Sequence, residues 1–369
     1  MNKPVRVLHV VVNMNRGGAE TLIMNLYRNI DRTRVQFDFL TCKEGVFDSE
    51  IKELGGMVHR IPYVSDVGHF GYIKSLNHFF STHHNYSIVH SHLNQMSGLV
   101  VREAKKNGIR YCITHSHNTG GEGSFLAKSY KWYSRLHIAP YSDYTFACSQ
   151  AAAKWLFGHK SNEAKLLNNG IEPESFMYSP DIRLVKRKEL GIDNQLVIGH
   201  VGRFTKQKNH KFIVGLFSEF LKKEPNSILL LCGDGVLRKE IEKKVNELNI
   251  QDNVKFLGVR SDINYLLQAF DIFIFPSLYE GLGVVLIEAQ AAGLPCLISE
   301  EIPKEVDMGL NLVKPLDITR RDLWINELEE LNKEKYNRNP SQLNSLRERG
   351  YDIKVTAGWL QDFYIMNSR

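Results

Sequence analysis

Short runs of β-branched and aliphatic residues recur along the whole chain, with amphipathic segments between them. This alternation is typical of parallel sheets covered by helices on both faces, because strands buried on both sides read as continuous apolar runs. The runs form two successive series, which predicts two doubly wound α/β domains. A chain of 369 residues is also too long for one ordinary core. The predicted strands lie at residues 5–12, 35–41, 87–92, 111–116, 144–149, 196–202, 227–233, 254–258, 272–277 and 295–299.

The join between the two domains is expected in the turn-rich stretch LLNNGIEPESF, residues 166–176, which a charged segment follows. We therefore expect an N-terminal Rossmann-like domain over residues 1–175 and a C-terminal one over 176–351. The last segment, residues 352–369, is predicted to be a helix with apolar residues on one face. Such a face needs a surface to pack against. The four residues on it are Trp359, Leu360, Phe363 and Tyr364.

Composition narrows the class of protein. The five cysteines are far apart in the sequence and form no Cys-x-x-Cys pair, so neither a disulfide framework nor a zinc-binding motif is indicated. No uninterrupted apolar run reaches the roughly 18 residues that a membrane-spanning helix needs. The N-terminal run VRVLHVVV is better explained as a buried strand than as a signal peptide. We expect a cytoplasmic protein.

The charge is spread unevenly. Residues 1–170 hold 20 Lys and Arg against 12 Asp and Glu, a net +8, whereas the remainder holds 27 against 29, a net −2. A basic N-terminal half predicts contact with anionic partners, such as lipid head groups or a phosphorylated acceptor, although chance scatter on a solvated surface would look the same. No nucleic-acid-binding motif accompanies the charge, so we expect no nucleic-acid partner.

Glycine-rich turns follow several predicted strands. Gly17 and Gly18 open a predicted helix after the first strand, and Gly233 lies in a CGDG turn. Glycines at a helix N-terminus let backbone N–H groups approach an anion, and the helix dipole favours negative charge there. A tight βα turn without a ligand would show the same residues, and the dinucleotide pattern G-x-G-x-x-G is missing.

The stretch GHVGRFTKQKNHKF (199–212) follows the first predicted strand of the second domain. Arg203 and Lys208 lie in the loop after Gly202, beyond the carboxyl end of that strand, where open α/β sheets bind ligands. A guanidinium fork and an ammonium group both suit a diphosphate. The alternative is a basic solvated loop.

The stretch PSLYEGLGVVLIEAQAAGLP (276–295) is the most specific feature of the chain. It predicts a strand end, a turn, and a helix that begins near Gly283, with Glu280 before the helix and Glu288 in its second turn. The free N–H groups at the helix start would face an anion while both carboxylates accept sugar hydroxyls. Glu288 sits among apolar residues, where an unpaired charge is costly, so a role as an ordinary surface residue explains it poorly.

These motifs resemble those of glycosyltransferase family 4. The pattern P-S-x-x-E-G-x-G-x-x-x-x-E-A, with G-R-x-x-x-x-K and G-G-A-E upstream, covers essentially the whole chain in the family's order. CITHSHNT, ACSQAAAKWLFG, NNGIEPESF and EEIPKEVD resemble the bacterial branch that builds capsular polysaccharides and exopolysaccharides. The resemblance implies a retaining enzyme of the GT-B fold, with two Rossmann-like domains facing across a cleft and a final helix that crosses back to the N-terminal domain.

The resemblance also implies roles for individual residues. Glu288 would bind the ribose hydroxyls and Glu280 the donor sugar near its 3-hydroxyl, while Arg203 and Lys208 would hold the diphosphate. Backbone groups would complete the donor site: Gly17, Gly18, Gly202, Gly281, Leu282 and Gly283 around the phosphates and sugar, with Gly233, Val259 and Arg260 around the base.

The family has a histidine at a strand end of the N-terminal domain, facing the donor sugar. THSHN offers His117, which fits the family pattern best, and His115 as second candidate. The similar pair His90 and His92 on the preceding strand is expected on the acceptor side. Isolated histidines are more often structural, and that alternative stays open for each of them.

The implied reaction moves a sugar from a nucleoside-diphosphate sugar, with a UDP-sugar favoured over GDP, to a glycan or a polyprenyl-diphosphate-linked acceptor. No Asp-x-Asp motif occurs, so we expect no metal and no cofactor. The segment SFLAKSYKWYSRLHIAPY (124–141) suggests peripheral contact with the inner face of an anionic plasma membrane, unless it is an ordinary core helix. The alternatives are a GT-B-fold UDP-sugar epimerase and a noncatalytic nucleotide-sugar-binding protein.

Overall fold

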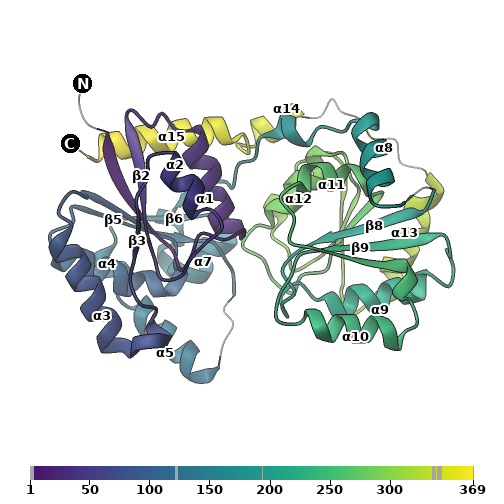
Figure 1. Ribbon diagram of the computed structural model, residues 1–369, viewed down its shortest axis with the longest axis horizontal. Coiled ribbons are helices and arrows are strands. Elements are labelled where there is room, and N and C mark those ends of the chain that lie inside the picture. Colours follow the sequence, from purple (N-terminus) through teal and green to yellow (C-terminus); the bar gives the residue numbers. More distant parts are fainter. Residues whose placement is uncertain (1–3, 121–123, 193, 335–337, 339–342, 369) are drawn as a thin grey trace. The chain divides into compact units, whose positions relative to one another are not determined.

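The computed structural model describes residues 4–120, 124–192, 194–334, 338 and 343–368 (Figure 1). The chain divides into two compact units. The first consists of Met1–Ile171 together with Gly350–Arg369, and the second of Glu172–Arg349. Each unit is built on its own parallel sheet with helices on both faces.

The first unit holds a seven-stranded sheet in the order β3-β2-β1-β4-β5-β6-β7, in which every pairing is parallel. Its strands are β1 (Val5–Val10), β2 (Val35–Thr41), β3 (Val58–Arg60), β4 (Ile88–Ser91), β5 (Tyr111–Ser116), β6 (Tyr144–Ala147) and β7 (Lys165–Leu166). Its helices are α1 (Gly18–Asn29), α2 (Asp48–Glu53), α3 (Val64–Thr82), η1 (Asn94–Met96), α4 (Ser97–Lys106), α5 (Phe125–Arg135), α6 (Ile138–Tyr141), α7 (Gln150–Phe157), η2 (Gly158–Glu163) and α15 (Ile353–Met366).

The second unit holds a six-stranded parallel sheet in the order β10-β9-β8-β11-β12-β13. Its strands are β8 (Leu196–Val201), β9 (Ser227–Cys232), β10 (Val254–Gly258), β11 (Ile272–Phe275), β12 (Cys296–Ser299) and β13 (Val313–Leu316). Its helices are η3 (Pro173–Phe176), α8 (Pro180–Glu189), α9 (His210–Phe220), α10 (Arg238–Glu247), η4 (Gln251–Asn253), α11 (Ile263–Ala269), α12 (Val284–Ala291), η5 (Lys304–Val306), α13 (Arg321–Glu334) and α14 (Leu343–Glu348).

Local sequence explains where several helices begin. The hydroxyls of Ser124, Ser149 and Ser179 accept hydrogen bonds from amides in the first turns of α5, α7 and α8, and the Asp352 carboxylate does the same for α15. Each cap satisfies a backbone donor that has no partner inside its helix. Pro180 follows the cap of α8 at a position where its missing N–H costs nothing.

The C-terminal helix α15 packs on the first unit, against α1 and the sheet (Figure 1). Leu360 and Tyr364 have no exposed surface, and Phe363 is buried beside them in the core that α1 shares. Trp359 lies at the margin of this face, with 43% of its surface exposed, and stacks on Phe363. The prediction that the final helix crosses back to the N-terminal domain is confirmed.

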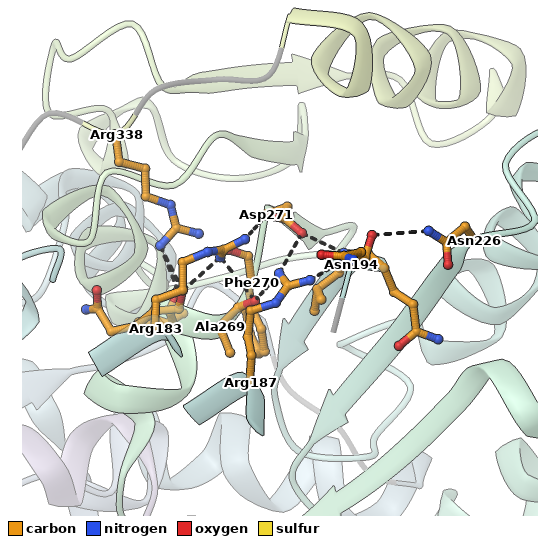
Figure 2. A network of polar contacts seen from close by, with 12 residues as sticks. Arg183, Arg187, Asn194, Asn226, Ala269, Phe270, Asp271 and Arg338 are labelled. Atoms are coloured by element: carbon orange, nitrogen blue, oxygen red, sulfur yellow. Dashed lines mark hydrogen bonds and ion pairs between the residues drawn. The ribbon is translucent and has the colours of Figure 1, made fainter. Parts of the chain in front are cut away.

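A network of charged side chains joins α8 to the start of β11 (Figure 2). The Asp271 carboxylate pairs with Arg183 at 2.5 Å and with Arg187 at 3.1 Å, and it also accepts the amide N–H of Val197 at 2.8 Å. Arg183 donates further to backbone carbonyls at the end of α11, the nearest of them that of Phe270 at 2.9 Å. The charged segment that follows the domain join therefore holds helix α8 against the sheet of the second unit.

Each run predicted as a strand contains one. The strands β3, β7 and β13 were not predicted, and all three lie at sheet edges. An edge strand has one neighbour and little burial, so its sequence lacks the apolar pattern on which prediction depends. Among the described residues, no helix is both long enough and apolar enough to cross a membrane.

Candidate functional site

Two glycine turns meet at the carboxyl ends of β8 and β9. Gly233 has a φ of +134°, and a Cβ there would lie 2.1 Å from the carbonyl oxygen of Gly202. A Cβ on Gly202 would lie 2.8 Å from Nε2 of His200. Gly233 therefore requires glycine for its backbone conformation and for close backbone packing, whereas at Gly202 a side chain would press on the His200 ring. The turns leave the strand ends open at the edge of the sheet where α/β folds bind ligands.

The loops that follow β8 and β11 are joined by hydrogen bonds. The amide of Leu278 donates to the carbonyl of Gln207 at 2.8 Å, and the Gln207 side chain donates to the carbonyl of Tyr279 at 2.9 Å. Beside this connection, Lys208 Nζ lies 2.6 Å from Glu280 Oε1, and 4.3 Å from the centre of the Phe275 ring. Two residues predicted for one site from segments 72 positions apart are thus in direct contact.

The Lys208–Glu280 pair is largely buried, with 16% of the lysine side chain and 8% of the glutamate side chain exposed. Burying two charges is costly, and their mutual attraction offsets that cost only where the geometry is good. Each group neutralises the other in the absence of a ligand. An anion near Lys208 and a hydroxyl near Glu280 would meet side chains that are already held in place.

Arg203 differs from Lys208 because it is exposed and its guanidinium forms no hydrogen bond or ion pair within the described part of the chain. Nearby in the fold, the helix α12 begins after Gly283, which has a φ of +85°. Across the described residues, the amides of Leu282, Gly283 and Val284 donate to no acceptor. One guanidinium and three free amides are the donors that a diphosphate or a sugar ring requires.

Glu288 lies in the second turn of α12 and is half-buried. No described residue donates a hydrogen bond to its carboxylate or pairs with it. Burial raises the pKa of Glu288 from its ordinary value of 4.5 to about 7. A carboxylate held without a partner in an apolar setting is suited to accept two hydrogen bonds from a ligand, such as the vicinal hydroxyls of a ribose.

The raised pKa of Glu288 predicts opposite pH effects on stability and on nucleotide affinity. The folded state holds a proton that the unfolded state has lost between pH 4.5 and about 7, so the contribution of Glu288 to stability falls as the pH rises through this window. Hydroxyl binding needs the ionised form, so UDP affinity should rise over pH 6–8. Glu288→Gln should flatten both profiles in thermal melts and in titration calorimetry. Unchanged profiles in this variant would contradict the assignment.

Of the two side chains predicted to lie near a nucleobase, one is exposed and the other already has partners within the protein. Val259 is exposed, with 58% of its surface accessible. The Arg260 guanidinium, in contrast, donates twice to the Asp262 carboxylate, at 2.8 and 2.7 Å, and approaches Glu189 at 3.5 Å. Arg260 and Lys186 lower the pKa of Asp262. Asp262 stands at the start of α11, but within the described residues its side chain bonds Arg260 and Lys186 and caps no amide.

In the first unit, Gly17 and Gly18 stand at the N-terminus of α1 as predicted. Gly17 has extended backbone, and a Cβ on Gly18 would meet nothing within 4 Å. Packing inside the unit therefore does not require glycine at position 18. The amides of Gly18 and Ala19 donate no hydrogen bond within the described residues, so this helix start is open to an anion.

The predicted histidines lie on one face of the first sheet, at the carboxyl ends of β4 and β5. His117 is partly exposed, and its backbone N–H donates to the Asn94 side chain at 2.8 Å. His115 has no exposed surface, and its ring stacks on that of His117 with centres 3.9 Å apart. Burial lowers the pKa values of both histidines, that of His117 to about 3. Of these two, His117 is the one that a ligand can reach.

The expectation that His90 and His92 line an acceptor surface requires correction. His90 is fully buried and its Nδ1 lies 2.6 Å from the Tyr364 hydroxyl of α15, while only 6% of His92 is exposed. The His92 ring instead lies between two other histidines. Its Nδ1 is 2.8 Å from Nε2 of His117, and its Nε2 is 2.9 Å from Nδ1 of His9 in β1. Sequence reasoning missed His9, because the run VRVLHVVV indicates only a buried strand. Parallel pairing of β1 with β4 places His9 beside His90.

Comparisons with known proteins identify the family of the chain. The family described as "Glycosyl transferases group 1" matches residues 182–313, and the "Glycosyl transferase 4-like domain" matches residues 17–170. The chain is also 35% identical, over 97% of its length and 96% of the relative's, to the putative glycosyltransferase EpsF of Bacillus subtilis (strain 168). The chain belongs to the glycosyltransferases of this family.

Two further relatives carry more specific names. The capsular polysaccharide biosynthesis glycosyltransferase CapH of Staphylococcus aureus is 29% identical over 77% of this chain and 78% of CapH. The UDP-Gal:alpha-D-GlcNAc-diphosphoundecaprenol alpha-1,3-galactosyltransferase of Escherichia coli is 29% identical over 58% of each chain. Among solved structures, Anabaena Alr3699/HepE in complex with UDP-glucose superposes with a TM-score of 0.81 at 20% identity, covering 99% of this chain and all of that one. The fold of this glycosyltransferase is therefore GT-B.

Proposed function

We propose that this glycosyltransferase transfers a sugar, with retention of anomeric configuration, from a UDP-sugar to a lipid-linked or glycan acceptor in polysaccharide synthesis. The observation that carries the proposal is the arrangement in the second unit: the Lys208–Glu280 pair, the free Arg203 and the partnerless Glu288 beside three open amides. It provides donors for a diphosphate and acceptors for sugar hydroxyls. The names of CapH and of the galactosyltransferase support the acceptor class.

The proposed reaction exchanges one bond at the anomeric carbon for another. The bond to the diphosphate oxygen breaks, and negative charge develops on that oxygen. Arg203, Lys208 and the amides at the start of α12 stabilise it, which is the largest single contribution expected in such a site. The acceptor oxygen bonds to the same face of the anomeric carbon, and its proton passes to the departing phosphate. Within this proposal Glu280 orients the donor sugar, and His117 keeps the role toward that sugar which the family resemblance implies.

No metal is expected to take part, because two basic side chains and free amides are available to neutralise the diphosphate. The test is incubation with candidate UDP-sugars and a diphosphate-linked acceptor in the presence of EDTA, followed by determination of the product anomer. Acceptor-dependent transfer with retention supports the proposal. Conversion of the UDP-sugar without acceptor would indicate an epimerase, and binding without turnover would indicate a sensor. Activity abolished by EDTA and restored by Mg²⁺ would refute metal independence.

We also propose that α5 and the start of α3 contact an anionic membrane surface. Ser134 is the one buried residue of α5, so the alternative of an ordinary core helix is wrong. Phe125, Leu126 and Trp132 are exposed by 82%, 79% and 58%, and Phe70 of α3 by 87%. A hydrogen bond of 2.8 Å between His69 and Tyr130 fixes the two helices to each other. Exposed apolar side chains beside lysines are suited to a lipid interface.

Reversing two charges on α5 should weaken membrane binding. Each lysine near an anionic surface contributes about 1 kcal/mol, so Lys128→Glu with Lys131→Glu should lower binding to phosphatidylglycerol-containing vesicles by at least about 30-fold. Arg135 is unsuitable for this test, because its Nε donates to the carbonyl of Leu156 and holds α5 to α7. The matched control is Lys222→Glu with Lys239→Glu in the second unit. Undiminished vesicle binding of the α5 variant would count against the membrane surface.

A further inference from the structure

The histidine cluster of the first unit contains several buried ring nitrogens without a hydrogen-bond partner in the described residues, which is unusual in a folded protein. His9, His90, His92, His115 and His117 lie on three neighbouring strands or directly after them, with adjacent ring centres 3.9–5.3 Å apart. The Nδ1 atom of His117 and both ring nitrogens of His115 are buried without a hydrogen-bond partner in the described residues. A buried polar group without a partner costs roughly 1–3 kcal/mol, so such a concentration points to a missing ligand.

Three of these rings already have the arrangement of metal ligands. One nitrogen from each of His92, His115 and His117 can be chosen so that all lie within 4.8 Å of one another. The Nδ1 of His92 and the Nε2 of His117 are 2.8 Å apart. Zinc–nitrogen bonds of about 2.0–2.1 Å in a tetrahedral site place ligand nitrogens roughly 3.3 Å apart, so small ring movements would admit an ion.

We propose that His92, His115 and His117 bind a transition-metal ion of the zinc class, and that its binding inhibits sugar transfer. The inhibitory part rests on the proposed function, because the ion would bind a ring nitrogen of His117, the partly exposed residue assigned to the reaction. The metal is thus an inhibitor and takes no part in the transfer itself. Imidazole nitrogen without carboxylate favours Zn²⁺, Cu²⁺ or Ni²⁺ over Mg²⁺ and Ca²⁺.

The surroundings of the three rings suit this ion. His9 contacts the far nitrogen of His92 at 2.9 Å and so orients that ring from outside the site. His117 has exposed surface, which provides an entry route and a place for water as fourth ligand. The neighbouring trio of His9, His90 and His92 is also closely spaced, but all three residues are buried, and it lacks a partly exposed member such as His117.

The test compares Zn²⁺ binding by the wild-type chain and by His115→Phe. The phenylalanine keeps the stacked ring and removes two nitrogens that bond nothing, so the variant should fold with a melting temperature equal to or above that of the metal-free wild type. We expect one equivalent of Zn²⁺ to bind the wild type in titration calorimetry and to raise its melting temperature, and neither effect in the variant. His84→Gln is the control for adventitious surface histidines, and it should behave as the wild type does.

Binding and inhibition are measured separately. The proposed site would be overturned if the wild type bound no Zn²⁺, or if His115→Phe bound Zn²⁺ as the wild type does. Either result would hold whatever the enzyme's activity. Where the site binds, transfer by the wild type should fall in proportion to zinc occupancy and recover with EDTA. The transfer rate of His115→Phe, relative to its own metal-free rate, should be insensitive to the same zinc. Full wild-type activity at saturating zinc would refute the inhibitory role while leaving the proposed transferase function intact.

Discussion

Replacing Lys208 with alanine is expected to lower the rate of sugar transfer by about 10²–10³-fold, the usual effect of removing one group that stabilises developing negative charge. Lys208 is held by Glu280 at 2.6 Å and by the face of Phe275, so its ammonium is already positioned when the donor arrives. The measurement is kcat for transfer. Lys206→Ala is the matched control, since Lys206 is an exposed residue of the same loop and should change kcat by less than about twofold.

A second variant, Glu280→Gln, tests whether Lys208 contacts the diphosphate itself or acts only through its ion pair with Glu280. Lys208→Ala should weaken UDP binding as well as transfer, because the lysine is assigned to the diphosphate. Glu280→Gln should leave UDP affinity nearly unchanged and lower transfer, because Glu280 is assigned to the sugar. A Lys208→Ala variant with nearly normal kcat would contradict the proposed mechanism. Equal loss of UDP affinity in both variants would show that the two residues act only as a structural ion pair.

Asp271→Ala is expected to destabilise the second unit by about 3 kcal/mol, which corresponds to a fall in melting temperature of roughly 6–12 °C. The substitution leaves two guanidinium groups and the Val197 amide without their shared acceptor (Figure 2). We expect the lower end of the range for broken buried pairs, because 25% of the Asp271 side chain is exposed. Thermal melts and urea titrations would measure the change.

Two further variants control for the Asp271 result. Asp271→Asn keeps an acceptor for the Val197 amide and should cost less than the alanine variant. Asp252→Ala removes an exposed carboxylate in the same unit and should change stability by less than about 0.5 kcal/mol. A melting temperature of Asp271→Ala within a degree of the wild type would mean that the network contributes nothing net to stability.

Much of the fold could be predicted from the sequence, because the patterns that indicate buried strands and helix starts are local. Buried parallel strands are continuous apolar runs, and the start of α12 at Gly283 follows from a glycine that adopts a positive φ. The edge strands β3, β7 and β13 escaped prediction because their residues are half solvated. The charged stretch after the domain join was visible in the sequence, but its role was not, because the contacts of its arginines with Asp271 depend on the tertiary fold.

The candidate site was predictable in its parts but not in its contacts. The spacing of Glu280 and Glu288 indicated sugar binding, whereas the ion pair between Glu280 and Lys208 depends on two loops brought together by parallel strands. The histidine cluster shows the same limit. Two His-x-His pairs were visible in the sequence, but the participation of His9 and the burial of His90 follow from strand register and from the packing of Tyr364.

The most direct test of the proposed donor class is a thermal-shift measurement with UDP, GDP, ADP and NAD, each with and without EDTA, on the wild type and on Glu288→Ala. A ligand that binds only the folded state stabilises it by about 2.7 kcal/mol at 100 times its Kd. We predict stabilisation by UDP that EDTA does not change and that Glu288→Ala abolishes. Stabilisation by NAD alone, or an equal UDP shift in Glu288→Ala, would contradict the assignment of this site to a UDP-sugar.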